Sequence, residues 1–282
     1  MNGSNISTKG MSRDEWVSLR RSYLGASDAS AVLGMNPWNS PVDVFLEKTG
    51  RATNNADSID MWLGREIEPV IAKLFEQESG MKCRQDFKIR CHPKYDYLRT
   101  NLDRVVQSAP LEMKMMAKYT DIPPHYYTQI MFQAMVTDAP HVYFAVLSTS
   151  TPRSFYWHKF MRDDDLIEEM RSECVNFWET YITGDEIPDP LTARDAKGLY
   201  PDPDPESTHE ADRDARNDVE MIADIVGKIK EKQSEVDELK ASVMNKMKES
   251  EVLTWHGLPI ATWRKTKDGK RFDMRSFQAE HP

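Results

Sequence analysis

The spacing of apolar residues predicts helices first and short strands after them. Residues 60–79 have the clearest helical pattern, a stripe at intervals of three and four formed by Ile67, Val70, Ile71, Leu74 and Phe75. Gly80 follows as a stop signal. Three shorter helices are expected upstream, because Ser12, Ser27 and Ser40 stand where N-caps precede helical patterns.

After Gly80 the period changes from helical to two residues, which is typical of strands. Extended segments are expected at 82–90, 97–107 and 111–116, with the last two joined as a hairpin through 108–110. The pattern then predicts a helix at 124–137, strands at 142–148 and 154–159, and a helix at 163–183. This order indicates an α/β or α+β domain with a mixed sheet flanked by helices.

The chain changes character after Gly184. Residues 185–212 are rich in proline and acidic residues and are expected to form a linker, after a first domain at 13–184 and a disordered segment at 1–12. A C-terminal extension at 213–282 is expected to hold a charged helix over 218–249. Short strands should follow, turning at His256-Gly257 and Asp268-Gly269.

Composition limits the class of protein. No run of about 18 apolar residues occurs, and the first dozen residues are polar, so we expect a cytoplasmic protein that is neither exported nor membrane-spanning. The three cysteines and the histidines lack the spacing of a zinc or iron–sulfur site. The net charge of −9 is concentrated in residues 151–250, which hold 25 acidic against 14 basic residues, while residues 1–150 hold 17 of each. A neutral N-terminal half is compatible with a positive groove for nucleic acid.

The sharpest chemical signal is Asp103 followed by Glu112 and Lys114. Glu112 and Lys114 are two apart and face one side of a strand, and a hairpin partner would bring Asp103 beside them. Carboxylates are suitable ligands for Mg²⁺, and a nearby ammonium can position a water for attack on phosphorus. By itself the E-x-K pattern is also typical of an exposed hairpin with ordinary charge pairs.

The surrounding motifs favour the chemical interpretation. In order, the chain has Gly64-Arg65-Glu66-Ile67-Glu68, then Asp103, then Glu112-x-Lys114, then Tyr126-Tyr127-Thr128-Gln129. With the opening segment 20–29, this set resembles the YqaJ-type viral recombinases of the PD-(D/E)xK nuclease superfamily, the group that includes bacteriophage lambda exonuclease. The resemblance covers residues 13–184 and implies a restriction-endonuclease-like core. The chain departs from the family pattern at Leu102-Asp103-Arg104, which lacks the usual proline and glycine around the acid.

The resemblance also implies roles for individual residues. It implies that Asp103, Glu112, Glu68 and the Met113 carbonyl bind Mg²⁺, for which Mn²⁺ would substitute. Lys114 would assist the attacking water, and Gln129 would lie at the active centre, with Gln133 one turn further on. Arg20 and Ser27, seven residues apart, match the pair that holds a 5′-terminal phosphate. An N-cap at Ser27 would support this role, because a helix N-terminus favours an anion.

The activity implied by the resemblance is 5′-to-3′ degradation of one strand of linear double-stranded DNA, leaving a 3′ single strand for an annealing protein. A homotrimeric ring, encoded by a phage or prophage and acting in the bacterial cytoplasm, is expected. Two alternatives stay open: an endonuclease or structure-specific repair nuclease with the same metal site, and a non-catalytic scaffold that binds DNA ends. Because Asp103, Glu112 and Lys114 are all present, a catalytic protein is favoured over the scaffold.

Overall fold

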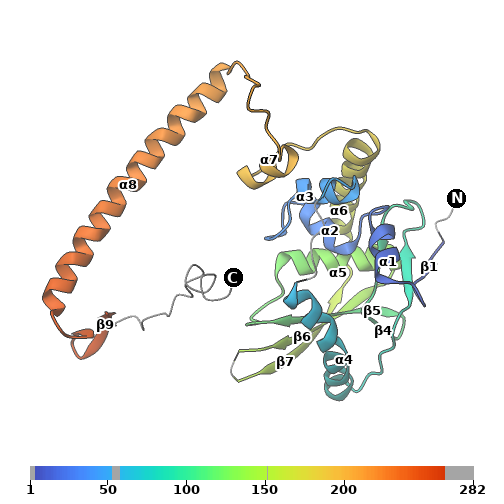
Figure 1. The fold of residues 1–282 in the computed structure, drawn as a ribbon. Helices are drawn as coiled ribbons and strands as arrows, with labels where there is room; N and C mark the ends of the chain where they lie inside the picture. The colour runs from blue at the N-terminus through green and yellow to red at the C-terminus, as the bar shows by residue number, and fades with distance from the viewer. Residues whose placement is uncertain (1–3, 53–57, 151, 264–282) are drawn as a thin grey trace, which may run out of the picture. The chain divides into compact units, whose positions relative to one another are not determined.

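The computed structural model describes residues 4–52, 58–150 and 152–263 and divides into two units, 1–203 and 204–282. The first unit is built on a mixed four-stranded sheet in the order β4 (Arg104–Val106), β5 (Ala109–Met116), β6 (His141–Ser148) and β7 (Ser154–Met161) (Figure 1). β5 and β6 are parallel, and the other two pairings are antiparallel. The expected mixed sheet is confirmed.

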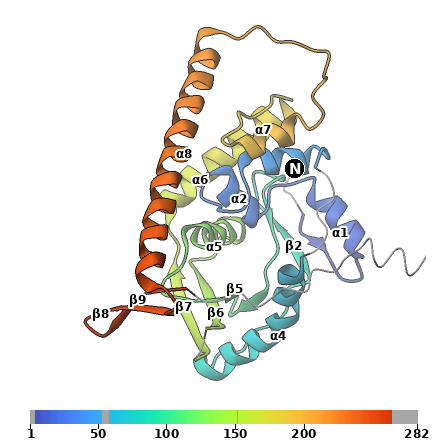
Figure 2. The ribbon, with the colours of Figure 1, turned by 60° about the vertical axis from the view of Figure 1, so that its left-hand side comes forward.

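Each face of this sheet is covered by a helix. Val142, Phe144 and Val146 of β6 pack in the cluster that contains α5 (Pro124–Thr137), whereas Tyr143 and Ala145 pack in the cluster that contains α4 (Ile59–Ser79). Figures 1 and 2 show the two helices on opposite sides of the sheet. Side chains of β5 alternate in the same way: Leu111 and Met113 pack in the cluster with α4, whereas Glu112 faces α5.

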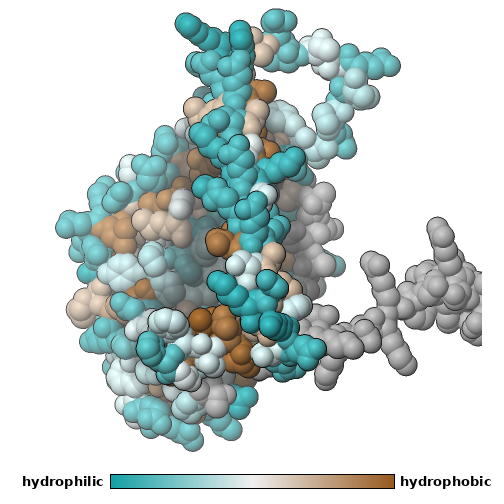
Figure 3. All heavy atoms as spheres, turned by 90° about the vertical axis from the view of Figure 1, so that its left-hand side faces the viewer, coloured by the Kyte–Doolittle hydropathy of each residue, from teal (hydrophilic) through white to brown (hydrophobic). Residues whose placement is uncertain are grey.

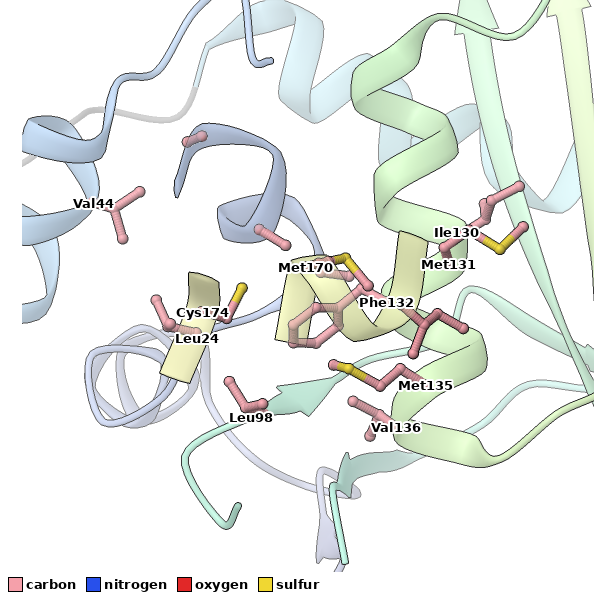
Figure 4. Close-up of a cluster of buried hydrophobic side chains, with 14 of the residues drawn as sticks. Leu24, Val44, Leu98, Ile130, Met131, Phe132, Met135, Val136, Met170 and Cys174 are labelled. Atoms are coloured by element: carbon pink, nitrogen blue, oxygen red, sulfur yellow. The ribbon is translucent and has the colours of Figure 1, made fainter. Parts of the chain in front are cut away.

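The larger hydrophobic cluster lies between α5 and three other helices, which are α2 (Ala26–Val32), α3 (Pro41–Lys48) and α6 (Asp164–Phe177). Figure 4 shows Phe132, Met135 and Val136 of α5 directed toward Met170 and Cys174, with Leu24 and Leu98 closing the cluster. The elements that complete this unit are α1 (Arg13–Arg20), the π-helical turn η1 (Trp178–Thr183) and a small sheet of β1 (Ile6–Ser7), β2 (Lys88–Cys91) and β3 (Arg99–Thr100).

Several predicted details are confirmed and others are wrong. Ser12 and Ser40 cap α1 and α3 as expected, and each cap is part of a capping box. Ser27 is not an N-cap, because α2 begins at Ala26 and its cap is Gly25, two residues before Ser27. Val70 is 46% exposed, since the buried face of α4 is narrower than the apolar stripe. The predicted disordered N-terminus differs from the structure, in which β1 pairs with β2.

The predicted linker at 185–212 contains a helix, although its many prolines are typical of a loop. Helix α7 (Ala193–Leu199) contacts α3 and belongs to the first unit. Its third residue, Asp195, is 3% exposed and accepts hydrogen bonds from the Ser40 hydroxyl (2.6 Å) and from the main-chain N–H groups of Leu191 and Thr192 (3.1 and 3.0 Å). These hydrogen bonds hold part of the predicted linker, residues 185–212, against the first unit.

The second unit consists of α8 (Arg213–Met247) and a hairpin of β8 (Val252–Trp255) and β9 (Leu258–Thr262). The predicted turn at His256-Gly257 is confirmed, whereas Asp268-Gly269 lies outside the described residues. In α8 only Met247 is buried, and hydrophobic residues (brown) are visible among hydrophilic ones (teal) at the surface in Figure 3. Among the described residues, no helix is both long and apolar enough to cross a membrane.

We predict that Asp195→Ala lowers the free energy of unfolding by about 1–3 kcal/mol at pH 7, because the hydroxyl of Ser40 and the N–H groups of Leu191 and Thr192 lose a buried acceptor. Although burial opposes its charge, hydrogen bonds from Ser40 and Thr192 hold the pKa of Asp195 below its usual 3.8. A lowered pKa stabilises the fold above pH 3.8, and this contribution disappears as the pH falls through the folded-state pKa. Urea unfolding at pH 7 and pH 3 measures both effects. The exposed Asp189→Ala is the control, and an equal loss in that variant would contradict the role of Asp195.

Candidate active site

A two-residue turn brings the first two predicted carboxylates together. Gln107 and Ser108 both adopt positive φ (48° and 79°), as a two-residue β-hairpin turn requires. The register Arg104↔Leu111 then places Asp103 across from Glu112. An Asp103 carboxylate oxygen accepts a hydrogen bond from the Met113 N–H at 2.8 Å. The Met113 carbonyl projects to the same side, because both main-chain groups of a strand residue do so.

Glu112 is a buried carboxylate that is fully engaged. It is 1% exposed and lies on the face of β5 that meets α5. Its Oε1 accepts from the Gln129 amide at 2.6 Å and from the Lys114 ammonium, and its Oε2 accepts from the Gln133 amide at 2.5 Å. Gln129 and Gln133 are one turn apart on α5, so one helix face supplies both amides. The structure therefore brings Glu112, Lys114 and Gln129 together as predicted.

Lys114 offsets part of the negative charge of this cluster. Burial disfavours its charged form, but Glu112 and Asp103 outweigh burial and raise the pKa of the ammonium above its usual value. Its Nζ also lies 5.1 Å from the centroid of the Tyr126 ring, a cation–π distance. The lysine is consequently a fixed cation, held between carboxylates and an aromatic face.

Glu68 approaches from α4 at the β4 edge of the sheet. Its Oε2 lies 4.0 Å from Nη1 of Arg104. Burial raises the pKa of Glu68, with Arg104 opposing and the charge of Glu112 adding to the rise. Burial, together with the charge of Glu112, raises the pKa of Asp103 well above its usual value. The charges of Glu112 and Glu68 thus disfavour the ionisation of Asp103, and the charge of Glu112 also disfavours the ionisation of Glu68.

This donor set fits a divalent cation in its chemistry. Carboxylate and carbonyl oxygens are the ligands that such ions prefer, and a cation would relieve the repulsion that raises these pKa values. Across residues 4–52, 58–150 and 152–263, however, no three His, Cys, Asp or Glu side chains are arranged to hold a metal ion. Both oxygens of Glu112 face other side chains, those of Gln129, Gln133 and Lys114. Metal binding by the predicted set therefore requires Glu112 to exchange some of these partners.

The structure also brings the predicted phosphate pair together. The Arg20 guanidinium donates to the Ser27 hydroxyl at 2.7 Å and to Asp28 at 2.7 Å. Lys48 contacts the other Asp28 oxygen at 2.8 Å, and the Gly25 N–H donates to that same oxygen. Burial opposes the charge on Asp28, but the two cations outweigh it and hold its pKa below the usual range.

Asp28 and Lys48 also belong to this cluster, although the sequence pattern did not predict them there. The anion at the start of α2 is the Asp28 carboxylate, which accepts a hydrogen bond from the Gly25 N–H at 2.8 Å, so the expected free N-cap at Ser27 does not exist. The spacing of Gly25 and Asp28, a cap and its N3 acid, was the available signal. Gly25 itself admits the arginine closely, because a Cβ there would lie 2.5 Å from Arg20 Nη1.

The chain is similar in sequence to known proteins. Residues 15–140 match the family model of the YqaJ-like viral recombinase domain. The chain is 32% identical to the uncharacterised protein YqaJ of Bacillus subtilis (strain 168), over 96% of this chain and 89% of that protein.

Two solved structures share the fold. The alkaline exonuclease LHK-Exo of Laribacter hongkongensis matches with a TM-score of 0.51 and 20% identity, over 61% of this chain and 93% of that chain. A putative exonuclease from Eubacterium rectale matches with a TM-score of 0.51 and 11% identity, over 74% and 96% of the respective chains. Family and fold together support the interpretation of the chain as a nuclease.

The amide contacts to Glu112 generate a stability prediction. Gln133→Met keeps the side-chain length but removes the donor from a buried carboxylate oxygen. We expect the free energy of unfolding to fall by about 1–3 kcal/mol. Chemical denaturation measures the change, with the exposed Gln85→Met as the control. A variant as stable as the wild type would contradict the assignment of Gln133 as a required partner of Glu112.

Proposed function

Because the chain belongs to the YqaJ-like viral recombinase family, we propose that it is a Mg²⁺-dependent exodeoxyribonuclease that acts on linear double-stranded DNA. It degrades one strand in the 5′-to-3′ direction and leaves a 3′ single strand for annealing recombination. The observation that carries this proposal is the convergence of Asp103, Glu112 and Lys114 on the β4–β5 hairpin. The site of action is the bacterial cytoplasm, for a protein encoded by a phage or prophage.

The residues at the site have separable tasks. Asp103, Glu112, Glu68 and the Met113 carbonyl would hold the cation, with Mn²⁺ as a substitute for Mg²⁺. A bound divalent cation supplies positive charge against the negative charge that develops on the phosphate. The ammonium of Lys114 is a hydrogen-bond donor close to the carboxylates, and in this position it can orient the attacking water. Gln129 and Gln133 orient Glu112 from the other side.

Recognition of the DNA end is assigned to Arg20 and Ser27. Their side chains meet on the surface, with Ser27 exposed and Arg20 part-buried beneath it. The cluster pairs two cations, Arg20 and Lys48, with Asp28 and the half-exposed Glu47, which lies 3.0 Å from Lys48 and 3.9 Å from Arg20. A terminal phosphate would compete with Ser27 for the guanidinium and gain charge-assisted hydrogen bonds.

We further propose a ring of three copies that encloses the DNA, and an annealing protein as the partner that takes up the 3′ strand. The support is the family membership alone. The second unit, with its exposed apolar residues on α8, is available to either assembly. A closed ring would explain how one strand is degraded without release.

Digestion of end-labelled DNA tests the direction and the end requirement. We expect a linear duplex to lose a 5′ label first in the presence of Mg²⁺ and to stay intact in EDTA. A covalently closed circle should resist, since an exonuclease needs an end. Cleavage of the circle would favour the endonuclease, and binding of ends without hydrolysis under any divalent metal would favour the scaffold.

Substitution of the site residues separates metal binding from DNA binding. Asp103→Asn and Glu112→Gln should each abolish hydrolysis while DNA affinity stays within about threefold, because the lost groups are proposed metal ligands. Lys114→Met should also be inactive but should retain Mg²⁺ binding by calorimetry. The exposed Lys118→Met is the matched control and should keep wild-type rates. Near-native hydrolysis by Asp103→Asn would reject the metal-site assignment.

The phosphate pair predicts a preference for phosphorylated ends. A duplex with a 5′-phosphate should be degraded at least about tenfold faster than the same duplex with a 5′-hydroxyl, because hydrogen bonds to charged groups contribute about 1.5–3 kcal/mol each. Arg20→Lys should reduce this ratio and leave slow hydrolysis. Arg21→Lys is the control, since one residue along a helix turns the side chain by about 100°. Loss of the preference in the Arg21 variant alone would move the site by one residue.

A further inference from the structure

A row of polar side chains leads from the buried carboxylate to the surface along one face of α5. Gln133, Gln129 and His125 are four residues apart and therefore lie one above the next. Gln133 is 1% exposed and Gln129 is half-buried, and both contact Glu112. His125, in the first turn, continues the row toward solvent. The next side chain in this direction is Trp38, whose ring centroid is 4.9 Å from that of His125 in an edge-on contact.

Trp38 is exposed and yet held in place. Its residue is 60% exposed, although a tryptophan side chain is usually buried. The main chain around it is fixed from both sides: Asn36 accepts hydrogen bonds from the N–H groups of Trp38 and Asn39 (2.9 and 3.0 Å), and Arg194 donates to the Trp38 carbonyl (2.9 Å). The indole therefore presents an open aromatic face from a rigid loop.

The ring contacts also connect Trp38 with the chemistry. His125 packs on Tyr126, with centroids 4.1 Å apart, and the Tyr126 ring lies 5.1 Å from Lys114 Nζ. Burial and the charge of Lys114 lower the pKa of His125, so the imidazole is neutral at pH 7. Its Nε2 is buried and has no hydrogen-bond partner within the described residues. A neutral imidazole between the indole and the active site acts here as a packing surface.

We propose that Trp38 is a base-stacking residue of the DNA site, on which a nucleobase of the strand being cut rests beside the scissile phosphate, with His125 positioning the indole. The inference rests on the proposed nuclease function and adds a contact to the base. Every base has a π-face, so an exposed indole holds single-stranded DNA without selecting sequence. An end-degrading nuclease must accept any base at this point, and stacking meets that requirement.

A scan with abasic DNA tests the contact directly. Duplexes carry one tetrahydrofuran abasic residue at the first, second or third position from the 5′-phosphate, and initial rates are compared with those on intact DNA. We expect the wild type to slow about tenfold at one of these positions. Trp38→Ala should be slow on intact DNA and should show no additional loss at that position. Trp38→Phe should restore most of both the rate and the abasic penalty.

Two controls separate stacking from damage to the fold. Trp255→Ala removes a similarly exposed indole from the second unit and should keep the wild-type profile. His125→Ala should weaken the abasic penalty without abolishing hydrolysis, as a positioning role requires. A Trp38→Ala enzyme that keeps the full abasic penalty, or a wild type without a penalty at any of the positions, would overturn the proposal.

Binding in EDTA keeps this inference distinguishable from the proposed function. Fluorescence anisotropy with a labelled oligothymidylate measures affinity without hydrolysis, and Trp38→Ala should bind about tenfold more weakly than the wild type. If the wild type cuts no DNA but this loss is found, the nuclease proposal fails and the stacking contact stands. Equal affinities would reject the stacking contact even if the enzyme is active.

Discussion

The buried charge of Glu112 is the constraint on which the site depends. A carboxylate that is 1% exposed is costly unless each of its oxygens has a partner. Here those partners come from two elements, the amides of Gln129 and Gln133 on α5 and the ammonium of Lys114 on β5. The need to satisfy one ion therefore fixes which face of β5 meets α5, and with it the side of the sheet on which the chemistry takes place.

The same principle is used a second time around Asp28. This carboxylate is also buried, and it is satisfied by Arg20, Lys48 and the Gly25 N–H. In both places a buried acid organises cations that would otherwise lie apart. The difference is in what surrounds them. Glu112 shares its region with other carboxylates and so attracts positive charge, whereas Asp28 lies between two cations, Arg20 and Lys48.

Local patterns predicted most of the elements, because helix caps and strand alternation depend on neighbouring residues. The capping boxes at Ser12 and Ser40, the helix 124–137 and the hairpin before Glu112 follow from such patterns. Helix α7 did not, since what holds it is a hydrogen bond between Asp195 and Ser40, 155 residues apart. The site was predictable as a set of residues through the family resemblance. The engagement of Glu112 by two glutamines, and the position of Trp38, depend on tertiary packing that no local spacing encodes.

The turn at Gln107 and Ser108 has a consequence for the order in which the chain folds. Hairpins close in about 1–10 μs, whereas contacts between distant segments need larger loops to close first. Asp103 and Glu112 are nine residues apart and meet through the hairpin, while Gln133 is 21 residues beyond Glu112. Two acids are thus drawn together before the amides arrive. The cations that share those two strands, Lys114 and Arg104, are the ones close enough to offset this repulsion at that stage, so the lysine serves the folding chain before it serves the reaction.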